Sequence, residues 1–150
     1  MVIRPADPDE GERLRQIAAA AKGVWGYERG RVGAWAASLD LTPGRLAAAH
    51  AFVAEVAGRA IGWAEILPPE GGVCVLEHLW VEPARIRGGV GTRLFAFAAD
   101  RARDLGATAI EWEAEPNALG FYTRMGGRPV RTTVSEWGRE LSIMCVSLPP

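Results

Sequence analysis

Apolar and polar residues follow two different spacings along this chain, which predict helices in some stretches and strands in others. Apolar residues such as Leu14, Ile17 and Ala21 recur three or four positions apart, as they do on one face of a helix. From residue 51 onward, short apolar runs bounded by turn residues are typical of strands, and residues 57–59 predict a tight turn between two of them. The expected strands are residues 2–4, 51–56, 60–67, 73–81, 110–114, 128–134 and 141–148, and the expected helices are residues 7–23, 31–39, 90–105 and 117–125.

The longest amphipathic stretch, residues 90–105, predicts a helix that connects two strands. Such a strand–helix–strand crossover joins parallel strands, whereas the short turns elsewhere join antiparallel ones, so the pattern predicts an α/β fold with a mixed sheet. Gly106 is placed to end the helix. The predicted inner face of this helix consists of Val90, Leu94, Phe97, Ala98, Arg101 and Leu105.

Length and composition indicate one globular domain spanning residues 1–150. Apolar residues make up 49% of the chain and charged residues 23%, which is enough apolar material to bury a core. The formal net charge of -1 lacks the basic excess of a general nucleic-acid binder, so we expect no nucleic-acid partner. No segment approaches the ~20 apolar residues of a membrane span, and the first residues do not form a signal peptide, so we expect a cytoplasmic protein with no membrane partner.

Cys and Lys are both scarce. Cys74 and Cys145 lie in apolar runs and are expected to be buried free thiols, because two cysteines in a chain of this length do not form a disulfide framework. No metal site is expected. Lys22 is the only Lys, and all the other cationic side chains are Arg. From the sequence alone we give this preference for Arg little functional weight.

The segment between residues 81 and 94 runs from a strand through a glycine-rich loop into a helix. The first N–H groups of a helix lack internal partners and carry partial positive charge, and glycines let the loop backbone approach an anion. The loop therefore predicts a pyrophosphate site, although alone it is equally compatible with an ordinary tight turn. It fits badly with a P-loop NTPase, because it has no Lys, and with a dinucleotide fingerprint, because Leu94 stands where a third Gly or Ala is expected.

Two segments together resemble the acetyl-CoA motifs of the GNAT N-acetyltransferase superfamily. The first runs from Leu76 to Gly91 and the second from Glu115 to Gly126, in the family's order and separated by one helix and one strand. The order of elements matches the family over essentially the whole chain. Ile86 stands where the family often has Arg or Gln, so backbone amides are expected to carry more of the phosphate binding. The resemblance implies the GNAT acyl-CoA N-acyltransferase fold, a mixed, mostly antiparallel sheet of six to seven strands flanked by about four helices.

Acetyl transfer from a thioester to an amine needs a donor for the carbonyl oxygen, an acid for the leaving thiolate and a base for the amine. The resemblance implies a backbone N–H of Leu79 or Val81 as the oxygen donor, on a strand that diverges from its neighbour in this family. Tyr122 matches the tyrosine of the second motif and is the candidate acid. A thiol has a pKa of ~8.5 and a tyrosine ~10, so a helix N-terminus or a cation near Tyr122 is needed to make the transfer favourable.

Glu77 is the candidate base. Period-two alternation places it on the same strand face as Leu79 and Val81, with His78 on the opposite face. Members of the family often carry a base on this face. The alternatives are an ordered water molecule and two carboxylates on neighbouring strands, Glu65 and Glu113.

Asn117 aligns with the residue that bonds the pantetheine arm of acetyl-CoA in related members. Because it precedes a short helix, it is alternatively an ordinary N-cap. Acetyl-CoA is the expected co-substrate. The expected cofactor-binding residues are Leu79, Trp80, Val81, Arg87, Gly88, Gly89, Val90, Gly91, Thr92, Asn117 and Tyr122.

The acceptor site is expected to have aromatic walls, because rings attract an amine through cation–π contact. The candidates are Trp25, Tyr27 and Trp137, which alternatively only pack in the core.

The resemblance implies an N-acetyltransferase that moves an acetyl group from acetyl-CoA to a primary amine of a small molecule or peptide by direct attack. The alternative is a non-catalytic acyl-CoA-binding or regulatory module on the same fold. The net charge disfavours a tRNA-directed acetyltransferase, and the resemblance allows a homodimer formed through the final strands.

Overall fold

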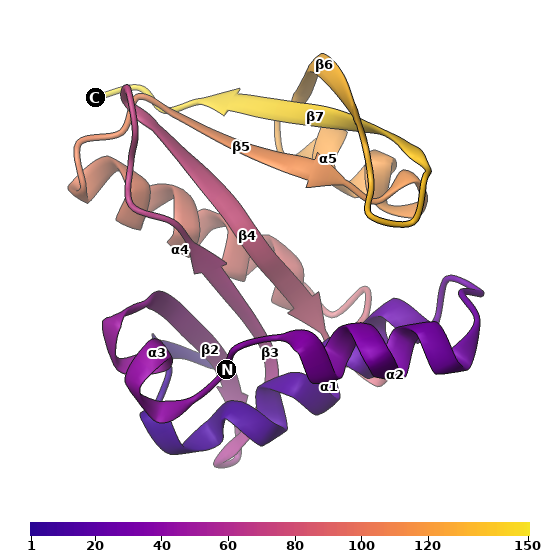
Figure 1. Ribbon diagram of the computed structural model, residues 1–150. Helices are drawn as coiled ribbons and strands as arrows, with labels where there is room; N and C mark the ends of the chain where they lie inside the picture. Colours follow the sequence, from indigo (N-terminus) through magenta and orange to yellow (C-terminus); the bar gives the residue numbers. More distant parts are fainter.

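A seven-stranded sheet with helices on both faces makes up the computed structural model, which describes residues 1–150 (Figure 1). The strands are β1 (Val2–Pro5), β2 (His50–Val56), β3 (Arg59–Ile66), β4 (Val73–Val81), β5 (Ala109–Ala114), β6 (Arg128–Val134) and β7 (Glu140–Ser147). The helices are α1 (Gly11–Gly23), α2 (Arg29–Ser38), α3 (Pro43–Ala48), α4 (Val90–Asp104) and α5 (Leu119–Arg124), with short 3-10 turns at Pro8–Glu10, Pro83–Arg85 and Pro116–Ala118.

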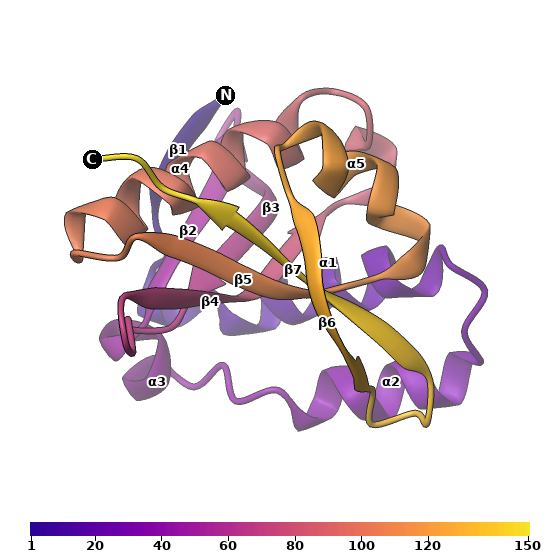
Figure 2. The same ribbon diagram turned by 90° about the horizontal axis from the view of Figure 1, so that it is seen from above.

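The strands lie in the order β1-β2-β3-β4-β5-β7-β6, and every neighbouring pair is antiparallel except β4 and β5. α4 makes the crossover between those two parallel strands, so the mixed, mostly antiparallel sheet predicted from the sequence is confirmed. α4 and α5 cover one face of the sheet, and α1, α2 and α3 lie on the other (Figure 2). None of the helices is long and apolar enough to cross a membrane.

Each face of the sheet has its own apolar core. The larger core lies under α4 and α5 and includes Cys74, and the smaller one joins α1 and α3 to β2 and β3 around Trp63. Both cysteines are buried free thiols, as predicted. The two cores hold the helices against the sheet from opposite sides.

The inner face of α4 is turned relative to the prediction. Phe97 is 37% exposed and Arg101 is also exposed, whereas Phe95 and Ala102 are buried beside the correctly predicted Leu94. Starting from Leu94, a helical stripe can widen toward residues 95 and 102 or toward residues 97 and 101 with equally good spacing. Periodicity alone therefore does not determine which side of the helix meets the sheet.

The sequence pattern does not predict the short helix α3, because Pro43-Gly44 indicates only a break before the next strand. Pro43 occupies the first helical position, where its missing N–H has no cost. Leu46 of α3 is buried in the smaller core. The helix is only six residues long, so it is held by this contact more than by any repeating pattern.

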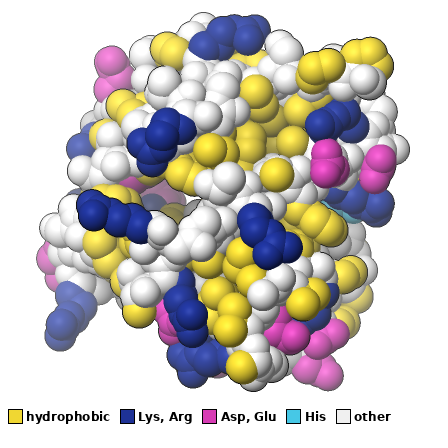
Figure 3. Space-filling model, turned by 180° about the vertical axis from the view of Figure 1, so that it is seen from behind, with side chains coloured by type: hydrophobic (Ala, Val, Ile, Leu, Met, Phe, Trp, Pro, Cys, Tyr) yellow, Lys and Arg dark blue, Asp and Glu magenta, His cyan; other side chains and the backbone are white.

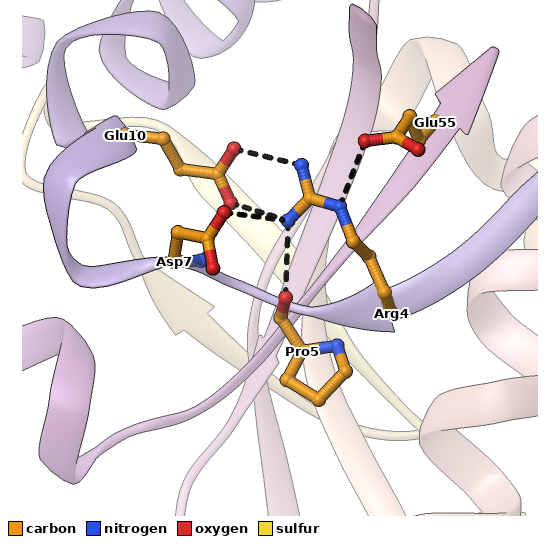
Figure 4. Close-up of polar contacts among 5 residues, drawn as sticks. All are labelled: Arg4, Pro5, Asp7, Glu10 and Glu55. Carbon is orange, nitrogen blue, oxygen red and sulfur yellow. Dashed lines mark hydrogen bonds and ion pairs between the residues drawn. The ribbon is translucent and has the colours of Figure 1, made fainter. Parts of the chain in front are cut away.

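A network of ion pairs ties the first strand to the start of α1 (Figure 4). The Arg4 guanidinium donates to Glu55 on β2 at 3.0 Å and to both carboxylate oxygens of Glu10 at 2.8 and 3.0 Å. It also donates to the carbonyl oxygen of Pro5 at 3.1 Å, and Asp7 lies 3.7 Å away. Glu10 in turn accepts the backbone N–H of Asp7 at 2.7 Å, which fixes the turn that leads into α1.

Candidate active site

The sheet opens between β4 and β5. The two strands pair only from Val73 with Ala109 to Val75 with Glu111, and beyond these three residue pairs they diverge (Figure 1). β4 remains paired with β3 as far as Val81, so its other edge faces the gap without a partner strand. The divergence that the sequence resemblance implied is confirmed.

The backbone of β4 directs two N–H groups into this gap. The N–H of Glu82, just after the strand, donates to the carbonyl oxygen of Ile61 on β3 at 2.8 Å. Successive N–H groups of a strand point toward opposite edges, so the N–H of Trp80 points toward β3. The N–H groups of Leu79 and Val81 therefore point into the gap, where they can donate to an oxygen of a bound molecule.

A β-bulge interrupts β4 at Glu77. Glu65 of β3 pairs with His78, but the next residue, Ile66, pairs with Leu76. Glu77 is the extra residue on the β4 side. A bulge of this kind breaks the strict alternation of faces along a strand.

The bulge overturns the predicted face of Glu77. Leu79 and Val81 pack against the core under α4, whereas the His78 ring lies 4.7 Å from the ring of Trp63, on the α1 face. Glu77 lies on the α1 face beside His78, because Leu76 and Leu79 on either side of this pair both pack against the core under α4. The expectation that Glu77 shares a face with Leu79 and Val81 and lies opposite His78 is therefore wrong.

Glu77 lies among other acidic residues. The Glu77 side chain is exposed, but the protein around it displaces part of its hydration and so raises the pKa of its carboxyl group. The negative charges of Glu65 and Glu113 raise that pKa further, against an opposing effect of Arg45. Glu65 itself is only 2% exposed and forms an ion pair with Arg45. A carboxylate with a raised pKa is chemically suited to accept a proton.

His78 is held as a neutral imidazole. Burial lowers the pKa of His78 to about 4, and the positive charges of Arg45 and Lys22 lower it further. The indole N–H of Trp80 donates to Nδ1 of His78 at 3.0 Å. His78 therefore orients the Trp80 ring and carries no charge near pH 7.

The glycine-rich loop leads into α4 with an open helix end. Gly89 precedes α4 with a φ of 80°, Arg87 has a φ of 73°, and no side chain caps the helix. Apart from Arg87, left-handed φ values in this loop are left to glycine, which adopts them without steric cost. The first N–H groups of α4 are consequently available to an anion, as predicted for a pyrophosphate site.

Contact between α4 and α5 brings the two sequence motifs together. A Cβ at Gly91 in the first turn of α4 would meet the Phe121 ring at 3.3 Å, so glycine is what allows α5 to approach. Tyr122 follows on α5 and is buried, with its ring 5.0 Å from that of Trp112. The indole N–H of Trp112 is buried without a hydrogen-bond partner.

The environment of Tyr122 does not make it a stronger acid. Burial raises the pKa of Tyr122 well above its usual range, and the negative charge of Glu115 raises it further. No helix terminus or cation near Tyr122 lowers its pKa enough to offset these two effects. Tyr122 is therefore protonated near neutral pH, but its proton is harder to release than that of an exposed tyrosine.

A chain of hydrogen bonds links the second motif to the opposite wall of the gap. The amide of Asn117 donates to Glu115 at 2.7 Å, and the hydroxyl of Tyr27 donates to the other oxygen of Glu115 at 2.6 Å. Arg139 donates to the Tyr27 hydroxyl at 2.9 Å. Glu115, which also accepts the N–H of Asn117, caps this turn, so the alternative that Asn117 is the N-cap is wrong. The roles of Glu115 and Arg139 are not predicted from the sequence.

A cavity of about 340 Å³ lies at the end of β5, between the α1–α2 connection and the β6–β7 hairpin. Tyr27 and Trp137 line it with their ring centroids 4.7 Å apart, together with Glu113 and Glu136. Trp25 is 37% exposed and does not line this cavity. A second cavity of about 380 Å³ adjoins residues 84–88 and lacks both acidic and aromatic side chains, so the first is the better candidate for an amine.

The cavity also holds the only Lys of the chain. The Lys22 ammonium lies 4.3 Å from the ring centroid of Trp35, 4.5 Å from that of Trp137 and 5.7 Å from that of Tyr27. The Trp80 ring on β4 is 5.9 Å away. Burial lowers the pKa of Lys22, and nearby carboxylates oppose this shift. No sequence motif points to a role for Lys22, and the one signal at this position is that it is the only Lys of the chain.

A cleft is visible on the α4 face, between the two halves of the molecule (Figure 3). Acidic and hydrophobic side chains lie at its base, and basic side chains lie on its rim. No group of three His, Cys, Asp or Glu side chains is arranged to hold a metal ion. The open end of α4 comes shortly after β4 and the ring-lined, acidic cavity lies at the end of β5, so both lie where the two strands have separated.

Known proteins resemble this chain in sequence and fold. The profile of the acetyltransferase (GNAT) family matches residues 12–127. A GCN5-related N-acetyltransferase from Rhodopseudomonas palustris is 24% identical, with a TM-score of 0.82 over 98% of this chain and 95% of that one. PaiA N-acetyltransferase from Thermoplasma acidophilum, in complex with coenzyme A, is 15% identical, with a TM-score of 0.81 over 97% and 98%. A GNAT family acetyltransferase from Brucella melitensis, in complex with acetyl-CoA, is 25% identical, with a TM-score of 0.70 over 99% and 88%. No curated protein sequence matches the chain.

Proposed function

The chain belongs to the acetyltransferase (GNAT) family, and we propose that it transfers an acetyl group from acetyl-CoA to a primary amine of a small molecule or peptide. The observation that carries this proposal is the divergence of β4 and β5, with the open end of α4 after one strand and an acidic, ring-lined cavity at the end of the other. Similar structures with bound coenzyme A and acetyl-CoA support the choice of donor. The family match within a single sheet supports one domain over residues 1–150.

The residues present are suited to acetyl-CoA. The uncapped α4 terminus offers the backbone N–H groups of residues 89–92 to a pyrophosphate, with Arg87 nearby. The N–H of Gly88, which was expected to take part, instead donates to the carbonyl oxygen of Arg85 at 3.2 Å. The unpaired edge of β4 and the amide of Asn117 offer hydrogen bonds to the amides of a pantetheine arm. When bound, acetyl-CoA would supply the thioester carbonyl that the amine attacks.

Each chemical requirement of direct attack has a proposed residue. The N–H of Leu79 or Val81 donates to the carbonyl oxygen as negative charge develops on it. Glu77 accepts the proton of the amine, and the bulge supports this role because it turns Glu77 toward the acceptor side. Tyr122 protonates the leaving sulfur. Tyr27 and Trp137 hold the acceptor, while Trp25 lies outside the cavity and contributes less.

Glu77 should control the pH dependence of the reaction. A base works in its ionised form, so the acidic limb of the kcat/KM profile should lie at higher pH than for an isolated glutamate, because the Glu77 pKa is raised. Glu113→Gln removes one like charge and should move that limb to lower pH. Glu77→Gln should abolish the limb and lower the rate. Profiles measured with a saturating acceptor test this, and an unchanged Glu77→Gln profile would exclude Glu77 as the base.

The same substitution should not weaken the fold. A carboxyl whose pKa is raised in the folded state favours folding below its unfolded-state pKa, and this contribution is lost as pH rises through the folded-state value. At neutral pH, Glu77→Gln is therefore expected to leave Tm unchanged or to raise it while activity falls. Glu70→Gln, on an exposed loop, is the matched control and should change neither quantity.

A panel of amines tests the proposed function directly. Acetyl-CoA should raise Tm, and thiol detection should show acceptor-dependent release of coenzyme A with at least one small-molecule or peptide amine. Tyr122→Phe should lower kcat in the same assay with little change in acetyl-CoA affinity, and an unchanged kcat would remove Tyr122 as the acid. Stabilisation by acetyl-CoA without turnover across the panel would favour the non-catalytic acyl-CoA-binding module instead.

A further inference from the structure

Lys22 occupies the position of an amine in the acceptor cavity. Its Nζ is surrounded by the rings of Trp35, Trp137, Tyr27 and Trp80, at 4.3 to 5.9 Å. Trp80 is the residue between the two β4 N–H groups that point into the gap. The only primary amine on any side chain therefore lies on the acceptor side of that gap.

Cation–π contact alone does not account for a lysine at this position. Arginine stacks on rings at least as well as lysine does, and the guanidinium of Arg31 already lies 4.5 Å from the Trp137 ring. Every other cationic side chain of the protein is Arg. The chemical difference between the two is that a lysine can lose its proton and become a nucleophile, whereas a guanidinium cannot.

We propose that Lys22 is itself an acetyl acceptor, so that the chain acetylates its own Nζ from acetyl-CoA. This inference rests on the proposed function, since it uses the same donor and the same β4 N–H groups. The lysine side chain is flexible, and the rings attract its cationic form. Once neutral, the amine is held less strongly and can turn from the rings toward the gap.

The transfer balances with groups already in the cavity. The ammonium of Lys22 loses one proton to Glu113 or Glu136. Both carboxylates line the cavity, and their negative charges act on the Lys22 ammonium. The nitrogen lone pair then forms a C–N bond with the thioester carbonyl carbon, and the electrons of the C–S bond leave with the sulfur. The second proton of the nitrogen passes to that sulfur. The products are Nζ-acetyl-Lys22 and free coenzyme A.

Peptide mass spectrometry after incubation with acetyl-CoA alone tests this inference. The α-amine of Met1 is an internal reference, because an α-amine is ordinarily more reactive than a lysine at neutral pH. If the fold directs the transfer, Lys22 should gain an acetyl group at least about tenfold faster than the α-amine does, owing to its placement beside the donor site. Lys22→Arg keeps the positive charge and should abolish the modification at this position.

The outcomes separate this inference from the proposed function. Unmodified Lys22 in a protein that releases coenzyme A with an external amine overturns self-acetylation and leaves the proposed function standing. Acetylation of Lys22 no faster than that of the α-amine also overturns it, because such labelling is undirected chemistry. If acetyl-CoA neither raises Tm nor labels Lys22, both proposals fail together. The unchanged Tm then shows that the protein does not bind the donor.

Discussion

Replacing Val81 by Pro is expected to lower kcat by about 10²–10³-fold, the typical cost of removing one oxyanion donor. The N–H of Val81 points into the gap between β4 and β5, so proline removes this donor without breaking a hydrogen bond to β3. Trp80, the preceding residue, already has the extended conformation that a following proline requires. Affinity for acetyl-CoA should change much less than kcat, because the charge on the oxygen develops only during the reaction.

Two further variants make this test specific. Val81→Ala keeps the N–H and removes only part of a side chain that packs against the core under α4, so its kcat should remain close to that of the unchanged protein. Leu79→Pro removes the other candidate donor. The larger loss of kcat identifies the residue that binds the oxygen. Equal, small losses for both proline variants would show that neither N–H stabilises the reacting carbonyl.

Replacing Trp63 by Ala should destabilise the protein by about 3–5 kcal/mol, as expected for a buried Trp truncated to Ala. Trp63 is 0% exposed at the centre of the smaller core, and its indole N–H donates to the carbonyl oxygen of Leu14 on α1 at 2.9 Å. The substitution leaves a cavity and removes the hydrogen bond that ties β3 to α1. Urea unfolding measured by circular dichroism gives the change in the free energy of unfolding.

Trp25 provides the matched control for this substitution. Its side chain is 37% exposed and it belongs to neither core, so Trp25→Ala should change the free energy of unfolding by less than about 1 kcal/mol. Trp63 also holds α1, the helix that carries Lys22, so Trp63→Ala should disturb the acceptor cavity. If both Trp variants lose the same stability, Trp63 does not anchor α1 as described.

Elements with an uninterrupted local pattern were predicted best. β4 and β6 begin and end at the predicted residues, since each is a run of strand-forming residues between clear turn signals. The loop before α4 was also placed correctly, because glycine and an open helix end leave a direct signature in the sequence. Such features are determined by residues that are adjacent in the sequence, so the sequence alone is enough to predict them.

Two features that depend on contacts between distant segments are not predicted by the sequence. The bulge at Glu77 arises from the pairing of β3 with β4, and no single-strand pattern reports an extra residue on one side. The rings around Lys22 come from α2, β4, the α1–α2 connection and the β6–β7 hairpin, which meet only in the folded chain. The roles assigned to Glu77, Tyr122 and Asn117 remain predictions until their variants are measured.

The divergence of β4 and β5 adds two inner edges to the outer edges of the sheet at β1 and β6. An open strand edge binds whatever presents amide groups in an extended form, and it does so through the main chain. Recognition of the donor is thereby largely independent of side-chain identity along the gap. Side chains of the α1–α2 connection and the β6–β7 hairpin can then change under selection for a new acceptor, while the main-chain site for acetyl-CoA stays the same.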